Sequence, residues 1–119
     1  SQTGRNIIRV VNLKADQPSV RDAEAHLHRE LTRMLSMGVH VMKLIHGYGS
    51  SGQSGSIRDR VHVLCRQLRG SGGIQGFILG EDFHTRNEAT NRLIRRLPQL
   101  RSDSDLNRGN RGISLLILR

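Results

Sequence analysis

The chain has few cysteine and aromatic residues. Cys65 is the single cysteine among 119 residues, which excludes an internal disulfide framework and a zinc site built from several cysteines. Tryptophan is absent, and the aromatic residues are Tyr48, Phe77 and Phe83. Folds that stack bases on a sheet surface need several exposed aromatic side chains, so this composition disfavours that mode of nucleic-acid binding. The low cysteine content fits a reducing, cytoplasmic setting.

Long apolar runs and acidic residues are also scarce. No segment approaches the ~18 apolar residues of a transmembrane helix, and no signal peptide is visible, so we expect a cytoplasmic protein without membrane contact. Asp and Glu total 10 against 19 Lys and Arg, a formal net charge of +9. All the basic residues except Lys14 and Lys43 are arginine, which binds phosphate through paired hydrogen bonds. A GC-rich genome also enriches arginine, but it does not explain the excess charge, which favours a nucleic acid or another polyanion.

Apolar patterning predicts alternating strands and helices. β-Branched, nearly continuous runs predict buried strands at residues 7–13, 39–45, 74–79 and 113–118. Apolar residues three and four apart predict two main helices, over residues 19–38 and 56–70, and a short third helix over residues 85–97. Capping boxes are predicted at the helix starts, with Ser19, Ser56 and Thr85 as the caps.

This element order predicts one domain over residues 1–119. We expect an α/β fold of the α+β two-layer sandwich type, β-α-β-α-β-(short α)-β, with a four-stranded mixed sheet. Strands one to three should be parallel because helices connect them. We expect residues 1–5 to be disordered or left over from expression, residues 84–112 to be an inserted helix and loop, and residues 101–112 to be polar and flexible.

Residues 44–58 contain the clearest functional signal. An apolar strand ends in His46, and the following loop has four glycines, Gly47, Gly49, Gly52 and Gly55. Glycine lets backbone N–H groups approach a ligand closely, and a helix start adds unpaired N–H donors and partial positive charge. The sequence therefore predicts a phosphate-binding loop here.

Two general nucleotide-binding motifs overlap this loop. Residues 47–52 match the dinucleotide pattern G-x-G-x-x-G, but no acidic residue lies between Asp59 and Glu81, where one is expected about 20 residues after the motif. Residues 47–54 approach the P-loop pattern, but Gln53 replaces the lysine that reaches the phosphates. Both interpretations are therefore disfavoured.

A third interpretation is a family resemblance. The segment Ile45-His46-Gly47-Tyr48-Gly49, followed by a glycine-rich loop and Ile57-Arg58, resembles the small MutS-related (Smr) domain. That family has a His-Gly-x-Gly or Thr-Gly-x-Gly motif at this strand end and a helix that opens with Leu/Ile-Arg. Residues 19–23 lie where its first helix is capped, and residues 109–113 where a glycine-rich turn leads into its last strand.

The resemblance implies both a fold and a function. Smr domains are similar to the C-terminal domain of bacterial translation initiation factor three, and characterised members bind nucleic acid and in several cases nick DNA or cut RNA. A second family motif, Leu-Asp-x-His, ends the first strand. Here Asn12 stands in place of its aspartate and Lys14 in place of its histidine, so the pair on which RNA-cutting members rely is absent.

We expect a DNA- or RNA-binding domain whose site includes this loop. The expected nucleic-acid contacts are Lys14, His46, Gly47, Tyr48, Gly49, Ser50, Gly52, Gly55, Arg58 and Arg111. The alternative is an endonuclease with His46 as acid and base, and a second alternative is a protein- or ribosome-interaction module in which the loop is vestigial. We expect no metal, no cofactor and a monomer.

The individual side chains have simpler interpretations too. His46 would cap the strand end by hydrogen bonding, Tyr48 would pack instead of stacking on a base, and Cys65 would be an inert core residue. The cluster of Arg92, Arg95 and Arg96 would be a solvated face. These alternatives remain open at the level of the sequence.

Overall fold

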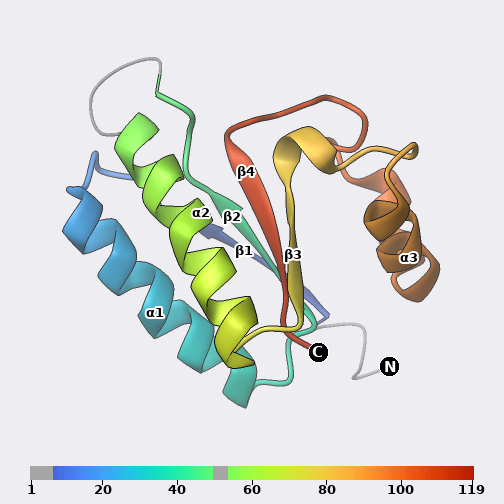
Figure 1. Cartoon of the computed structure of the whole chain (residues 1–119), viewed down its shortest axis with the longest axis horizontal. Helices are drawn as coiled ribbons and strands as arrows, with labels where there is room; N and C mark the ends of the chain where they lie inside the picture. Colours follow the sequence, from blue (N-terminus) through green and yellow to red (C-terminus); the bar gives the residue numbers. More distant parts are fainter. Residues whose placement is uncertain (1–6, 50–53) are drawn as a thin grey trace.

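The computed structural model describes residues 7–49 and 54–119, in which four strands form one mixed sheet (Figure 1). The strands are β1 (Ile8–Asn12), β2 (Val41–Ile45), β3 (Gly76–Leu79) and β4 (Ile113–Ile117), in the spatial order β1-β2-β4-β3. β1 pairs parallel with β2, whereas β4 is antiparallel to both of its neighbours. The first three strands therefore run in one direction, as predicted, and the last strand inserts between β2 and β3.

Two long helices cover one face of the sheet. α1 (Val20–Ser36) begins after Ser19, whose side chain accepts a hydrogen bond from the Asp22 backbone N–H at 3.0 Å, as the predicted cap requires. α2 (Ser54–Ser71) lies beside α1 (Figure 1). Their apolar stripes pack with Met42, Leu44 and Leu116 into one buried cluster. This cluster is the main core of the fold.

The opposite face carries a second apolar cluster. The helix α3 (Glu88–Arg96) and the 3₁₀ helix η3 (Pro98–Ser102) contribute to it, as does Phe83, which follows the 3₁₀ helix η2 (Gly80–Asp82). In Figure 1, α3 lies on the side of the sheet opposite α1. Val41 and Leu115 belong to this second cluster, while the residues next to them in β2 and β4 belong to the first. Because side chains alternate along a strand, the two central strands supply apolar residues to both faces.

Several predicted element boundaries are wrong. α2 begins at Ser54, so Ser56 lies in its first turn and is not its cap. α3 is capped by Asn87, which accepts a hydrogen bond from the Thr90 backbone N–H at 2.9 Å. Thr85 lies two residues before this cap and instead donates its backbone N–H to the Asn107 side chain at 2.9 Å. Asparagine and threonine are both good caps, and the sequence did not decide between them.

The segment before β4 is anchored to the sheet. Lys43 Nζ lies 2.8 Å from Asp103 Oδ1 and 2.5 Å from Asp105 Oδ2, and its side chain is 9% exposed. Asp105 also accepts a hydrogen bond from the Asn110 side chain at 2.8 Å. Residues 101–112 are polar, as predicted, but they form turns held by partly buried ion pairs, which the prediction of a flexible loop missed. The description of residues 84–112 as an inserted helix and loop stays a prediction, and residues 1–5 lie outside the described residues.

Candidate functional site

The predicted site residues meet where the three parallel strands end. Asn12 pairs with Ile45, and the Leu13 backbone N–H donates to the Ile45 carbonyl at 2.8 Å, so Lys14 follows β1 beside the end of β2. The N-terminus of α2, the end of β3 and the start of β4 lie at the same end of the sheet (Figure 1). Ligands of open α/β sheets bind at this end. Ser50 and Gly52 lie outside the described residues.

The glycine loop packs directly on the first turn of α2. Gly49 has a φ of +96°, and a Cβ atom at this position would lie 2.7 Å from Gly55 Cα. A side chain here would therefore collide with helix backbone, and the positive φ would strain it further. The two glycines bring the loop backbone against a helix start, where the first backbone N–H groups have no partner inside the helix.

A second backbone contact holds the start of the loop. The N–H groups of His46 and Gly47 both donate to the Gly112 carbonyl, at 2.9 and 3.0 Å. A Cβ atom on Gly112 would lie 3.3 Å from Gly47 Cα and 3.3 Å from a Tyr48 ring atom. The backbone at Gly47–Gly49 therefore packs closely against the backbone at both Gly55 and Gly112, with no room for side chains between them.

His46 is fully buried beneath this loop. Its Nδ1 lies 2.7 Å from the Gly47 carbonyl oxygen, which can only accept, so Nδ1 carries the proton. Its Nε2 lies 2.9 Å from Ser114 Oγ and accepts that hydroxyl's hydrogen. Burial lowers the pKa of His46 to about 4, although the bond to Gly47 opposes the shift. The side chain is therefore neutral at pH 7 with both nitrogens used.

His62 and His46 contact each other edge to face. Their ring centroids are 6.1 Å apart and the rings are inclined by 85°. Burial lowers the pKa of His62, and the nearby Arg58 guanidinium lowers it further. Two neutral imidazoles thus pack against each other, and one of them, His46, contacts the first residue of the glycine loop.

Arg58 connects three elements around the site. Its Nη2 lies 2.6 Å from Glu81 Oε2 in η2, and its Nε donates to the Arg111 carbonyl at 3.1 Å. The Arg58 side chain is 14% exposed, so most of its hydrogen-bonding capacity faces the protein. The structure therefore places Arg58 at the predicted site, where it holds α2 against η2 and the turn before β4.

Tyr48 borders an open hollow beside the loop. Tyr48 is 59% exposed, and Arg108 and Arg111 line the same hollow of about 380 Å³. Asp105 also reaches the hollow, but it is ion-paired with Lys43. An exposed aromatic ring next to two guanidinium groups can contact a flat ring and an anion together.

Lys14 and Asn12 occupy the strand end on the other side of His46. Asn12 Oδ1 accepts a hydrogen bond from the Lys14 backbone N–H at 3.0 Å, which forms a tight turn after β1. The Lys14 side chain is exposed at this turn. Asn12 is itself exposed. The predicted contact residues Lys14, Tyr48 and Arg111 are thus accessible, whereas His46 is not.

Several residues of this site were not among those predicted from the sequence. Ser114, His62 and Glu81 hold His46 or Arg58, and Gly80 lets two backbone segments touch, because a Cβ on it would lie 1.8 Å from the Asn110 carbonyl oxygen. Gly80 and Glu81 directly follow the third predicted strand, as His46 and Gly47 follow the second. This shared position at the ends of parallel strands is the sequence signal that could have indicated Gly80 and Glu81 as site residues.

The described residues contain neither a metal-binding cluster nor a helix suited to crossing a membrane. Within residues 7–49 and 54–119, no group of three or more His, Cys, Asp and Glu side chains is placed to hold a metal ion. In the same part of the chain, no helix has both the length and the apolar character needed to cross a bilayer.

The fold is similar to that of a known domain. The chain matches no protein-family model and no curated protein. In structure it is similar to the Smr domain of Thermus thermophilus MutS2, with a TM-score of 0.57 and 17% sequence identity; the match covers 93% of this chain and 98% of that one. The chain therefore has an Smr-like fold.

Proposed function

We propose that this chain binds DNA or RNA, with a backbone phosphate held by the glycine loop and the N-terminus of α2. The observation that carries the proposal is the contact between Gly49 and Gly55, which brings the loop backbone to the helix start without intervening side chains. The first turn of α2 begins Ser54-Gly55-Ser56-Ile57, so no carboxylate in it competes with an anion. Helix N-termini and glycine-rich loops are both favourable positions for phosphate.

The exposed side chains around the loop extend the contact beyond one phosphate. Lys14 lies on one side of the loop and Arg108 and Arg111 on the other, where they would neutralise neighbouring phosphates. Tyr48 would stack on a base or a sugar in the hollow that it shares with both arginines. In this proposal Arg58 and His46 position the loop and do not touch the ligand, because both are engaged by protein groups.

Fluorescence anisotropy with labelled single-stranded DNA, single-stranded RNA and duplex tests the proposal. Lys14, Arg108 and Arg111 would contact about three phosphates, so log affinity should fall with log salt concentration with a slope of about −2 to −3. Tyr48→Ala should weaken binding by about 1–3 kcal/mol if the ring stacks on a base. Affinity that does not depend on salt, or that is unchanged in Arg108→Ala/Arg111→Ala, would reject this site.

A glycine pair offers a matched control. Gly49→Ala strains a positive φ and meets Gly55, whereas Gly72→Ala strains a similar φ of +83° with nothing within 4 Å of the added Cβ. Only Gly49→Ala should weaken nucleic-acid binding, since only it separates the loop from the helix start. Equal losses in both variants would show that general destabilisation, and not the loop contact, is responsible.

Endonuclease activity is the second candidate for the same site. His46 would serve as acid and base only if its bond to Ser114 opened and released Nε2, while Lys14 stabilised charge on the reacting phosphate. The adjacent His62 supports this alternative, because its Nε2 is buried without a hydrogen-bond partner among the described residues. Cleavage of structured RNA or supercoiled DNA that disappears in both His46→Ala and His62→Ala would support a nuclease; cleavage that persists in both would come from a contaminant.

A further inference from the structure

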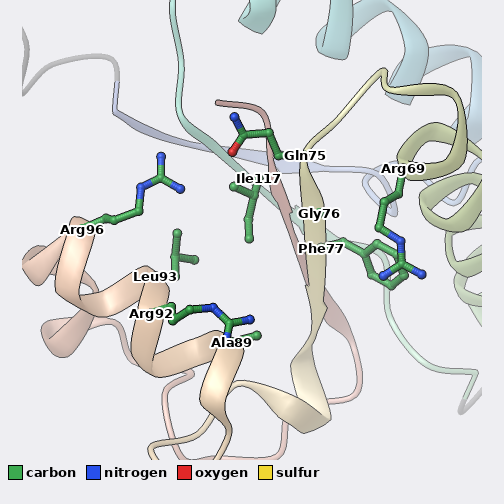
Figure 2. A pocket seen from close by; sticks show the side chains of 9 residues that line it. All are labelled: Arg69, Gln75, Gly76, Phe77, Ala89, Arg92, Leu93, Arg96 and Ile117. Carbon is green, nitrogen blue, oxygen red and sulfur yellow. The ribbon is translucent and has the colours of Figure 1, made fainter.

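A separate hollow lies along β3, away from the glycine loop. It has a volume of about 430 Å³ and is located at the start of β3 (Figure 2). The glycine loop follows β2 at the opposite end of the sheet, where β3 ends (Figure 1). Its lining combines small or apolar residues with three arginines and one glutamine. The small or apolar lining residues of the hollow are Gly76, Phe77, Ala89, Leu93 and Ile117, and the polar ones are Arg69, Gln75, Arg92 and Arg96.

The hollow exposes one edge of the sheet. β3 is the outermost strand, and among the described residues it pairs with β4 alone. The outer edge of such a strand presents backbone N–H and C=O groups that another strand can pair with. Residues of β3 and of α3 both line the hollow, which therefore lies beside this edge strand (Figure 2).

Gly76 leaves room for a backbone at this edge. A Cβ atom on Gly76 would meet only Ile117 Cδ1, at 3.9 Å, so the space above it is open. Glycine within a strand is often found where another backbone approaches closely. Ala89 is also small, and together with Leu93 it provides an apolar wall opposite the strand. The shape of the hollow therefore suits an extended chain better than a bulky ring system.

Arginine side chains flank this edge on both faces of the sheet. Arg69 lies over the Phe77 ring, 4.8 Å from its centroid, while Arg92 and Arg96 project from α3 on the other side (Figure 2). Arg92 contacts Glu88 at 3.1 Å, but this pair is 58% and 87% exposed and is therefore weak. Arg96 donates to the Arg119 carbonyl. Each guanidinium thus retains donors for an incoming carboxylate.

We propose that an extended acidic segment of a partner protein adds to β3 as a fifth strand of the sheet. Side chains of an added strand alternate between the two faces, so acidic residues on both faces would reach arginine: Arg69 on one and Arg92 and Arg96 on the other. A second copy of this chain is disfavoured, because it would bring a net charge of +9 against the same arginines. Nucleic acid lacks the regularly spaced backbone N–H and C=O groups that pair with a strand edge.

Peptide binding measured by fluorescence anisotropy tests the proposal. The probe is a fluorescein-labelled peptide about eight residues long, enough to span β3 at ~3.3 Å per residue, in which Glu-Glu pairs alternate with Val-Thr pairs. Arg92→Glu/Arg96→Glu should weaken binding by about tenfold or more, since it replaces two charge-assisted contacts with repulsion. The matched control is Arg95→Glu/Arg101→Glu, which changes the net charge equally but lines a different hollow. Equal losses in the two pairs would overturn the site.

Two further measurements test the strand pairing itself. Peptides N-methylated at one or the other set of alternate residues should differ, because an added strand turns only one set of its N–H groups toward β3; equal binding by both would overturn the pairing. Gly76→Val fills the hollow beside Ile117 and should abolish peptide binding while thermal melting shows a folded protein. Two outcomes would overturn the assignment of an acidic peptide as the occupant. One is self-association of the protein that Gly76→Val removes. The other is oligonucleotide binding that falls more in Arg92→Glu/Arg96→Glu than in the control pair.

Discussion

The Nε2 atom of His46 lies 2.9 Å from Ser114 Oγ, so a buried hydrogen bond links the end of β2 to the start of β4 directly beneath the glycine loop. The second bond of the ring, from Nδ1 to the Gly47 carbonyl, fixes both the tautomer and the direction in which the chain leaves β2. The loop geometry therefore depends on an uncharged His46.

This dependence gives a prediction for stability against pH. Burial lowers the pKa of His46 to about 4, below the value of about 6.5 expected in the unfolded chain. Between these values the unfolded state binds more protons than the folded state, so stability rises with pH across this window and is lost on acidification. For His46 alone, lowering the pH from 7 to 5 should cost roughly 2 kcal/mol of unfolding free energy. Urea denaturation at the two pH values measures this cost.

The control is His46→Gln, which removes the titrating group and keeps a polar side chain. The variant should have a lower free energy of unfolding than wild type at pH 7. At pH 5 this difference in unfolding free energy should be smaller by roughly 2 kcal/mol, because only the wild type is destabilised by protonation of His46. His62 titrates in both proteins and cancels in the comparison. A gap that is the same at both pH values would contradict the proposed neutral, buried state of His46.

The close approach at Gly80 predicts a large effect of one added methyl group. A Cβ on Gly80 would lie 1.8 Å from the Asn110 carbonyl oxygen and 2.7 Å from the Ile113 carbonyl oxygen, both of which are backbone atoms. Gly80→Ala should therefore destabilise the fold by at least about 3 kcal/mol, the upper end for overpacking. Gly70→Ala, in α2 with nothing within 4 Å of the added Cβ, should instead be neutral or stabilise by up to about 1 kcal/mol. Thermal denaturation of the two variants checks both signs.

The Lys43 ion pairs predict that removing the lysine lowers stability and that neutralising both aspartates restores most of it. Lys43→Met would leave Asp103 and Asp105 without their cation in a partly buried position, which should cost roughly 3 kcal/mol. Adding Asp103→Asn and Asp105→Asn to that variant should recover most of this loss, because the amides keep the oxygens that accept the other hydrogen bonds of these side chains. Chemical denaturation of the single and triple variants measures the recovery. A triple variant no more stable than the single one would show that the pairs themselves, and not uncompensated charge, carry the energy.

The sequence was sufficient for the common direction of the first three strands and for the main helices. Apolar runs and helical periodicity placed β1, α1, β2, α2 and β4 in order, and Ser19 caps α1 as predicted. The insertion of β4 between β2 and β3 depends on long-range packing, because its side chains Leu115 and Leu116 complete two separate cores. No local pattern encodes that choice. The Lys43 anchor was missed for the same reason, since its partners lie sixty residues away in sequence.

The candidate site shows the same division between local and distant information. Glycine content and the strand–loop–helix order indicated the backbone of the loop, and the exposed positions of Lys14, Tyr48 and Arg111 are compatible with their predicted contacts. The burial of His46 was not predictable, because it depends on Ser114 in the last strand, and the ion pair that holds Arg58 depends on Glu81. Both partners become neighbours only once the sheet is assembled.

The most direct test of the central claim is a backbone amide NMR titration of the protein with a short single-stranded oligonucleotide. We expect the amides of residues 47–49, 54–57 and 108–112 to shift together and saturably, while those of β3 and α3 do not move. We also expect Gly49→Ala to abolish these shifts and Gly72→Ala to retain them. Saturable shifts centred on β3 and α3, or none in the loop and the first turn of α2, would contradict nucleic-acid binding at this site.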